Sequence, residues 1–243
     1  MNEQQIGEDI EGLLARRRAL EARSLAIPGF AERLRALRSW QACRLARTYE
    51  ELRRDERYTA AVEFFLSDLY GPHDFGRRDS ELTRAVTPLK RVLPAALLAV
   101  LAQAIELDVL TLELDQGMVE HLAAGPVTEA AYATAYRALG RAAARERQID
   151  LTASIGAELE RLVRRRWIVA ALRAAQLPAR AAGFGVLQEF LERGFTAFRR
   201  MGSARPLLQA IRERETRLME ALLGADPSVS RLLSPERAVD ARA

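Results

Sequence analysis

The residue types that could do chemistry are concentrated between Glu63 and Asp79, in the stretch EFFLSDLYGPHDFGRRD. This stretch holds adjacent phenylalanines, three aspartates, a tyrosine, a histidine and an arginine pair. The aspartates can pair with Arg77 and Arg78, and would then brace a corner between two helices through caps and ion pairs. Alternatively, His73 and the two arginines can face the free amides of the next helix, which favour a carboxylate or phosphate.

The second interpretation, an anion pocket, supplies the candidate ligand-binding residues. Phe64 and Phe65 differ by about 100° around a helix, so that one can enter the core while the other reaches a neighbouring helix or a pocket. Asp79 argues against an anion at this corner, because it can itself cap the helix that follows. The candidate ligand-binding residues are Phe64, Tyr70, His73, Arg77 and Arg78.

The stretch from Glu63 to Asp79 also resembles a signature, FFLxDLYGPxDFxRRD, of uncharacterised bacterial proteins that are entirely helical. The resemblance covers this stretch alone. It implies a helical fold and no known activity.

A second unusual segment runs from Pro94 to Tyr136 and contains six acidic residues but no lysine or arginine. Glu106, Glu113 and Glu120 recur every seven residues and form one stripe of a helix, while Asp108 and Asp115 form another. Carboxylates on a largely apolar helix need partners, which predicts ion pairs with arginines of other helices. The expected partners are Arg33, Arg35, Arg38, Arg44 and Arg47 in one helix, and Arg161, Arg164, Arg165 and Arg166 in another.

A metal or haem site is the alternative for the acidic segment. Di-iron bundles repeat a Glu-x-x-His pattern on two helices, and this chain lacks that pattern, so that no metal site is predicted and Glu113, Glu120 and His121 are only weak candidates. His121 can be a haem ligand or a general base. A histidine without a second histidine nearby is more commonly a hydrogen-bonded structural residue. The cofactor, if any, is unknown from sequence.

A third segment, Arg161 to Ala175, places three consecutive arginines beside Trp167 and could contact phosphates or acidic lipid. The formal net charge of the whole chain is only +4, and acidic residues precede the arginines. We therefore expect these arginines to pair with the acidic segment, and we expect no specific nucleic-acid binding. Cys43, the single cysteine, is interpreted as a small buried residue.

Apolar residues recur at spacings of three and four throughout the chain, and no segment alternates like a strand, which predicts an all-α fold. Proline and glycine divide the pattern into a compact bundle of about seven to nine helices. Residues 1–224 are expected to form one domain, and residues 225–243 a partly disordered tail. Expected helices cover about residues 4–25, 30–69 with a possible break near Arg57, a segment that begins at Ser80, and residues 94–124, 128–148, 150–176, 178–201 and 206–224. The helices over 128–148 and 150–176 can also form one kinked helix.

Composition narrows the functional classes. With 49% hydrophobic residues the chain can bury a core, and a single cysteine excludes a disulfide framework. The acidic amino terminus and the short uncharged run from Val92 to Ile105 predict neither a secretory signal nor a membrane span. We expect a cytoplasmic binding protein for an acidic or amphipathic small molecule or a partner helix, with homo-oligomer formation open; the alternative is a helical enzyme that uses haem or iron.

Overall fold

The computed structural model describes residues 3–66, 95–165 and 185–233, together with single positions between 166 and 184. The described parts contain ten helices and no strand, which confirms the all-α prediction. The helices are α1 (Glu3–Ala26), α2 (Phe30–Thr48), α3 (Glu50–Arg54), α4 (Glu56–Phe64), α6 (Ala95–His121), α7 (Glu129–Leu139), α8 (Ala142–Val163), α10 (Gly185–Met201), α11 (Arg205–Leu223) and α12 (Val229–Leu233).

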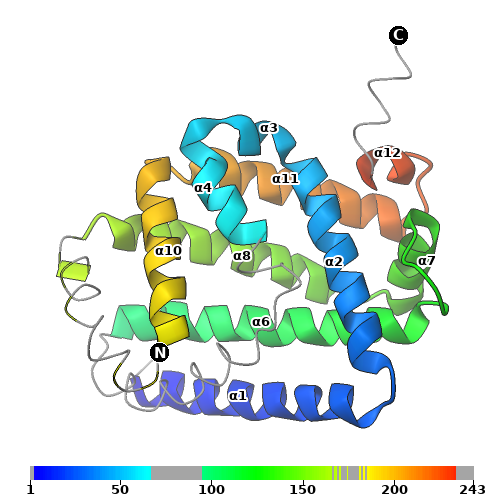
Figure 1. Cartoon of the computed structure of the whole chain (residues 1–243), viewed down its shortest axis with the longest axis horizontal. Helices are drawn as coiled ribbons and strands as arrows, with labels where there is room; N and C mark the ends of the chain where they lie inside the picture. The colour runs from blue at the N-terminus through cyan, green and yellow to red at the C-terminus, as the bar shows by residue number, and fades with distance from the viewer. Residues whose placement is uncertain are drawn as a thin grey trace.

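Four long helices lie side by side in the order α1, α6, α8 and α11 (Figure 1). Helices α2, α4 and α10 cross this row: α2 contacts α6, while α10 packs against both α4 and α8. Helix α7 lies at one end, against α6 and α11. The bundle therefore has a row of near-parallel helices with a second set lying across it.

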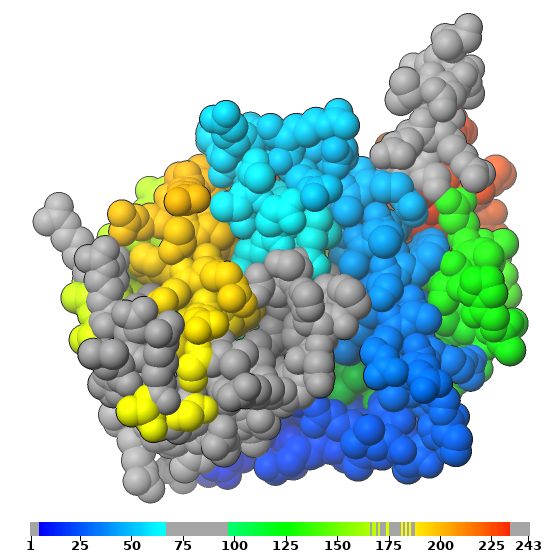
Figure 2. Space-filling model, viewed as in Figure 1, coloured from blue at the N-terminus to red at the C-terminus, as the bar shows by residue number. Residues whose placement is uncertain are grey.

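One face of the molecule shows how the crossing helices cover this row. In Figure 2 most of the described surface belongs to α2, α3, α4 and α10, with α1 along one edge. Helices α8 and α11 lie largely behind them. Side chains that point from α8 or α11 toward α2 and α4 are therefore shielded from water on this side.

Several boundaries predicted from capping residues and helix breakers are confirmed. Helix α1 ends at Ala26, and the chain turns at Gly29, whose φ of 73° lies in the left-handed region that favours glycine. Thr128 caps α7 by accepting a hydrogen bond from the Ala131 amide. Helix α11 begins with Pro206 in its first turn.

Other predicted boundaries are wrong. The helix expected over residues 128–148 ends at Leu139, because the next two residues, Gly140 and Arg141, both adopt positive φ. The predicted cap Asp150 lies inside α8. A glycine within an otherwise periodic pattern can continue a helix or end it, so that periodicity alone placed the end of this helix nine residues too late, at 148 instead of 139.

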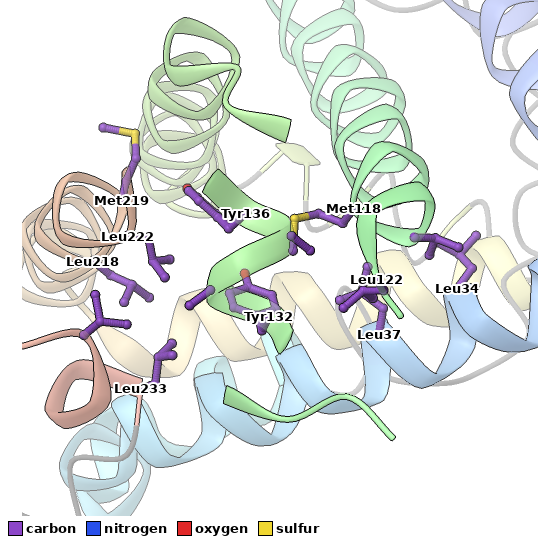
Figure 3. Packing of buried hydrophobic residues seen from close by; sticks show 14 of the residues in the cluster. Leu34, Leu37, Met118, Leu122, Tyr132, Tyr136, Leu218, Met219, Leu222 and Leu233 are labelled. Atoms are coloured by element: carbon purple, nitrogen blue, oxygen red, sulfur yellow. The ribbon is translucent and has the colours of Figure 1, made fainter. Parts of the chain in front are cut away.

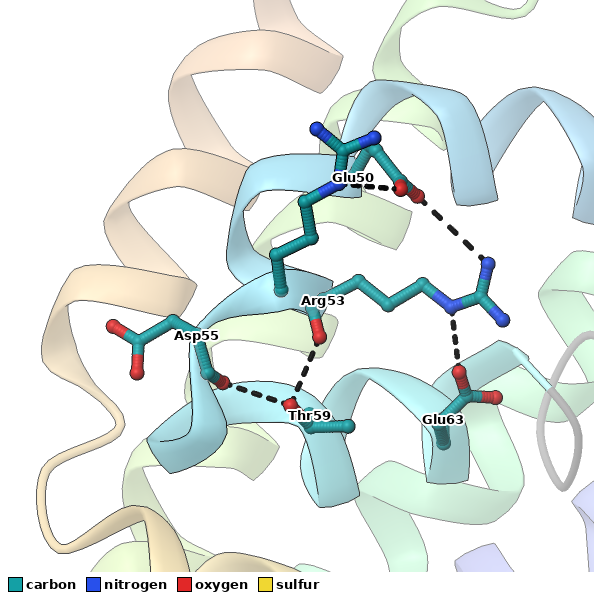
Figure 4. Close-up of polar contacts among 6 residues, drawn as sticks. Glu50, Arg53, Asp55, Thr59 and Glu63 are labelled. Carbon is teal, nitrogen blue, oxygen red and sulfur yellow. Dashed lines mark hydrogen bonds and ion pairs between the residues drawn. The ribbon is translucent and has the colours of Figure 1, made fainter.

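The chain also breaks between α3 and α4, and polar contacts fix the angle there (Figure 4). Asp55 caps α4 by accepting from the Arg57 amide at 2.9 Å. The Thr59 hydroxyl donates to main-chain oxygens of the turn, and Arg53 donates to Glu63 at 2.6 Å. These contacts aim α4 into the bundle, so that its last turn lies against the core.

The largest apolar cluster joins α2, α6, α7, α11 and α12. In Figure 3, Tyr132 and Tyr136 of α7 lie between Leu222 of α11 and Met118 of α6. Leu233 of α12 is buried in the same cluster. The chain therefore stays packed to residue 233, inside the segment expected to be a tail from residue 225.

A second apolar cluster lies between α1 and the first half of α6. Ile6 and Ile10 of α1 pack with Leu98 and Ile105 of α6, and all four are nearly fully buried. The apolar start of α6 is thus a core segment, as predicted. No helix within the described ranges is both long and apolar enough to cross a membrane.

Candidate functional site

A cavity of about 110 Å³ lies where α2, α4, α6, α7, α8 and α11 converge. One wall carries several polar side chains, among them Arg44, Arg145 and Glu215. The rest is largely apolar and comes from leucine, isoleucine, methionine and aromatic residues. A concave apolar space with a few convergent polar groups is the usual form of a small-molecule site.

Arg44 and Glu215 form a buried ion pair on this wall. Arg44 Nη1 lies 2.5 Å from Glu215 Oε1, and the Tyr49 hydroxyl donates to the same oxygen at 2.9 Å. Burial by itself lowers the pKa of Arg44, but the Glu215 carboxylate outweighs burial and raises that pKa above its ordinary value. Burial and the Glu215 charge together raise the pKa of Tyr49. Arg44 therefore keeps its proton and its charge beside a neutral tyrosine.

Asp115 is the other carboxylate on the cavity wall, and it is also paired. It is 2% exposed and accepts hydrogen bonds from Arg38 Nε at 3.0 Å and Gln41 Nε2 at 3.2 Å. Both partners come from α2. Its charge is thus balanced by Arg38.

Arg145 differs from these groups, because it forms no ion pair with any carboxylate of the described residues. It is 5% exposed. Its Nη1 donates to Gln148 over a long 3.4 Å, and its guanidinium carbon lies 4.5 Å from the centre of the Tyr136 ring. Its Nε and Nη2 are buried and have no hydrogen-bond partner in the described parts of the chain. This cation is held by one weak hydrogen bond and one ring face.

The charges around the cavity therefore do not cancel. Among the residues that the structure describes, Arg44 and Arg145 on the wall and Arg38 behind it face two carboxylates (Asp115 and Glu215), which leaves one positive charge. Leaving a buried charge without a counter-charge costs several kcal/mol. Burial raises the pKa of Tyr136, although the Arg145 cation partly opposes the shift, so that this tyrosine does not supply the missing negative charge.

The sequence-predicted ligand residues lie elsewhere. Phe64 is buried between α4 and α10, where its ring centre lies 5.1 Å from that of Phe190. A Cβ at Gly194 would lie only 2.8 Å from the Phe64 ring, which shows how closely α10 approaches. Its neighbour Phe65 lines the cavity instead. The other four candidates, Tyr70, His73, Arg77 and Arg78, lie outside the described residues.

The prediction that the acidic segment forms interhelical ion pairs is confirmed, but most of its expected partners are wrong. Of the predicted arginines, only Arg38 pairs with this segment in the described structure. The other partners are three arginines of α1 and Arg147 of α8, none of which was among the predicted partners. The pairs are Arg147 with Glu106 through two contacts of 2.8 Å, Arg17 with Asp108 at 2.5 Å, Arg16 with Glu113, and Arg23 with Glu120.

The arginines near the end of α8 do not reach the acidic segment. Arg161 pairs with Glu158, and Arg164 pairs with Glu160, each at 2.7 Å and each within one turn of helix. The expected pairing of these two arginines with α6 is therefore wrong. Glutamates three and four residues earlier in the chain lie on the same face of the helix and pair with these arginines instead.

The weak metal and haem candidates do not come together. Glu113 and Glu120 are each paired with an arginine of α1, and His121 is exposed at the end of α6. In the described ranges no three His, Cys, Asp or Glu side chains are grouped to hold a metal ion. Cys43 is exposed, so that its interpretation as a buried residue is wrong.

The fold and the cavity define an all-helical protein with a charged internal cavity. The chain belongs to the family described as "Domain of unknown function (DUF8198)", whose model matches residues 21–229. The match includes every helix that forms the cavity, whereas most of α1 precedes it. Comparison with curated proteins and with solved structures found no match.

Sequence reasoning missed Arg145, the residue that distinguishes this cavity. The signal was its helical spacing: Ile149 and Thr152 follow at four and seven residues, so all three share one face of α8. Glu215 shows the same signal, with Leu218 and Leu222 at three and seven residues. A charged residue that lies on the apolar face of a helix is expected to be buried. This expectation depends on its helical spacing and not on how many charged residues lie near it in the sequence.

Proposed function

We propose that this protein binds a small acidic molecule in the interhelical cavity, with Arg145 as the cation that receives it. The observation that carries the proposal is a buried arginine on the cavity wall without an ion-pair partner in the described structure. An anion in the cavity supplies the missing negative charge and accepts the unused hydrogen bonds. Charge-assisted hydrogen bonds of this kind are about twice as strong as neutral ones.

The neighbouring residues support a binding role for Arg145. Arg44, which is buried, and Arg38, which is half-buried, each pair with a carboxylate of this chain. An arginine that served the fold alone would be expected to have such a partner too, because an uncompensated buried charge is strongly destabilising. A ring face at 4.5 Å offsets only part of that cost.

The test is thermal unfolding of the full chain with chloride, acetate, inorganic phosphate and benzoate at equal ionic strength. We expect at least one anion to raise the melting temperature of the wild type. At a ligand concentration 100 times Kd the gain is about 2.7 kcal/mol, which corresponds to roughly 5–11 °C for a chain of this length. Arg145→Met should lose this gain.

Arg147→Met is the matched control. Arg147 lies two residues further along α8, but it is exposed and paired with Glu106. It should respond to the anion as the wild type does. Phosphate also stabilises proteins generally by exclusion from their surface, and such a gain would be equal in all three proteins. The proposal fails if no anion stabilises the wild type more than Arg145→Met.

We also propose that the protein is located in the cytoplasm, as expected from the sequence. The one cysteine, Cys43, is exposed and free, and a reducing compartment keeps such a thiol from pairing with another chain.

A further inference from the structure

Resting on the proposed function, we infer that the ligand is a monocarboxylate with a compact apolar body about the size of a benzene ring. Its carboxylate pairs with Arg145, and its body fills the apolar part of the cavity. Three independent features of the cavity lead to this ligand class: the edge of the guanidinium that is unused, the charge that is missing and the space that is available.

The unused nitrogens of Arg145 select a carboxylate. Nε and Nη2 are the two nitrogens without partners, and they are neighbours along one edge of the guanidinium. That edge matches a carboxylate through two parallel N–H to O hydrogen bonds. Nη1, on the other side, is the nitrogen that reaches Gln148. The free edge is thus the one suited to a planar acceptor with two oxygens.

The charge balance selects a single negative charge. Arg44 is already matched by Glu215, and Asp115 by Arg38, so that one positive charge remains among the described residues of the cavity. A dianion would bring a second negative charge into a wall that already holds two carboxylates. Like charges in a desolvated site oppose binding, which disfavours inorganic phosphate and dicarboxylates.

The volume and lining select a compact apolar body. About 110 Å³ is somewhat less than the roughly 150 Å³ of an engineered apolar cavity that holds benzene. Apolar side chains from four helices and from the end of α4 line this space, including Leu45, Val62, Phe65, Ile211 and Leu218. Phe65 follows the last residue of α4. Acetate would leave most of these groups without contacts, and a long acyl chain would not fit.

Calorimetric titration of the full chain tests this inference with benzoate, acetate, phthalate, octanoate and benzyl alcohol as probes. We expect benzoate to bind at least tenfold more tightly than each of the other four. The comparison with acetate measures the apolar body, phthalate the second charge, octanoate the length and benzyl alcohol the carboxylate. Arg147→Met, the surface control, should bind benzoate as the wild type does.

Variants separate the two halves of the ligand. Arg145→Lys keeps the charge but loses the two-nitrogen edge, and should weaken benzoate binding at least tenfold. Ile211→Phe fills the apolar side, and should weaken benzoate at least tenfold while leaving acetate binding within about threefold. Because Ile211→Phe leaves every polar group intact, it tests the inference even if substitutions of Arg145 unfold the protein.

The outcomes distinguish this inference from the proposed function. If acetate, phosphate or phthalate binds as tightly as benzoate and depends on Arg145, the anion site stands and the inferred ligand class is overturned. If octanoate binds more tightly than benzoate, the inferred size is overturned. If no acid binds in an Arg145-dependent way, both the inference and the proposed function are overturned.

Discussion

Two groups of arginines in this molecule face acidic residues in different surroundings. In the α1–α6 ion-pair row, Arg16, Arg17 and Arg23 of α1 pair with Glu113, Asp108 and Glu120 of α6. Around the cavity, Arg38 and Arg44 pair with buried or half-buried carboxylates, and Arg145 pairs with none in the described structure. Arg16 and Arg23 of the row are exposed to water, whereas Arg17 is buried and the cavity wall lies inside the bundle.

The difference teaches that the same ion pair has different consequences at the two places. Arg23 and Glu120 are both more than 40% exposed, so that water solvates either charge when its partner is removed. Arg44 is 7% exposed, and nothing replaces its carboxylate. The Arg23–Glu120 pair is therefore optional for stability, whereas pairing at the cavity is required. The absence of a described ion-pair partner for Arg145 therefore needs an explanation.

The largest effect is expected from Glu215→Ala. This change leaves the Arg44 cation buried without its counter-charge and removes the acceptor of the Tyr49 hydroxyl. Removing one partner of a buried pair costs about 3–5 kcal/mol of unfolding free energy. Chemical denaturation measures this loss. Glu213→Ala, an exposed site on the same helix, should change stability by less than about 0.5 kcal/mol.

A smaller loss is expected from Asp115→Ala. Arg38 loses its ion pair but is 27% exposed and can turn toward water, while Gln41 loses its acceptor. We expect a loss of about 2–3 kcal/mol. Asp150→Ala removes an exposed pair with Arg212 and serves as the control. Equal losses in the two variants would contradict the contrast between buried and exposed pairs.

The cavity also makes stability sensitive to alkaline pH through Tyr49. Burial and the Glu215 charge raise the pKa of Tyr49 in the folded state, so the folded chain holds this proton more firmly than the unfolded chain does. The resulting stabilisation is complete below pH about 10, the ordinary tyrosine pKa, and is lost as the pH rises above it. Denaturation of the wild type and Tyr49→Phe between pH 8 and about 11 should show a smaller decline in the variant.

The exposed Arg23–Glu120 pair of the α1–α6 ion-pair row should give the smallest loss. Glu120→Gln removes an exposed pair with Arg23, and we expect a change of about 0.2–1 kcal/mol that shrinks further at high salt. Urea denaturation at two salt concentrations measures it. A loss as large as that of Asp115→Ala would show that this exposed pair is as important to stability as a pair on the cavity wall.

Most helices could be predicted from sequence, because their ends depend on local signals such as Pro28–Gly29, Thr128 and Pro206. The break at Gly140 was misplaced, because a glycine inside a periodic pattern is compatible with either outcome. Ion-pair partners were mostly mispredicted, because arginines occur on nearly every helix and tertiary approach decides which of them meets α6. The row with α1 shows this clearly, since no local pattern distinguishes Arg16 or Arg23 from the other arginines.

The cavity could not be predicted in the same way. Six helices form it, and only their packing reveals that Arg145 and Glu215 share a space while Phe64 turns toward α10. What the sequence did contain was a charged residue in register with an apolar face of α8. That pattern predicts burial, but it does not reveal whether the partner of the charge is a side chain or a ligand.

The central claim is that Arg145 serves a ligand and not the fold, and the unfolding free energy of Arg145→Met without added anion tests it most directly. Methionine keeps an unbranched flexible stem but is shorter than arginine, and it removes an uncompensated buried charge. The claim predicts that this variant is at least as stable as the wild type in chemical denaturation, in contrast to Arg44→Met, which leaves Glu215 without its partner. A loss in Arg145→Met as large as that in Arg44→Met would contradict it.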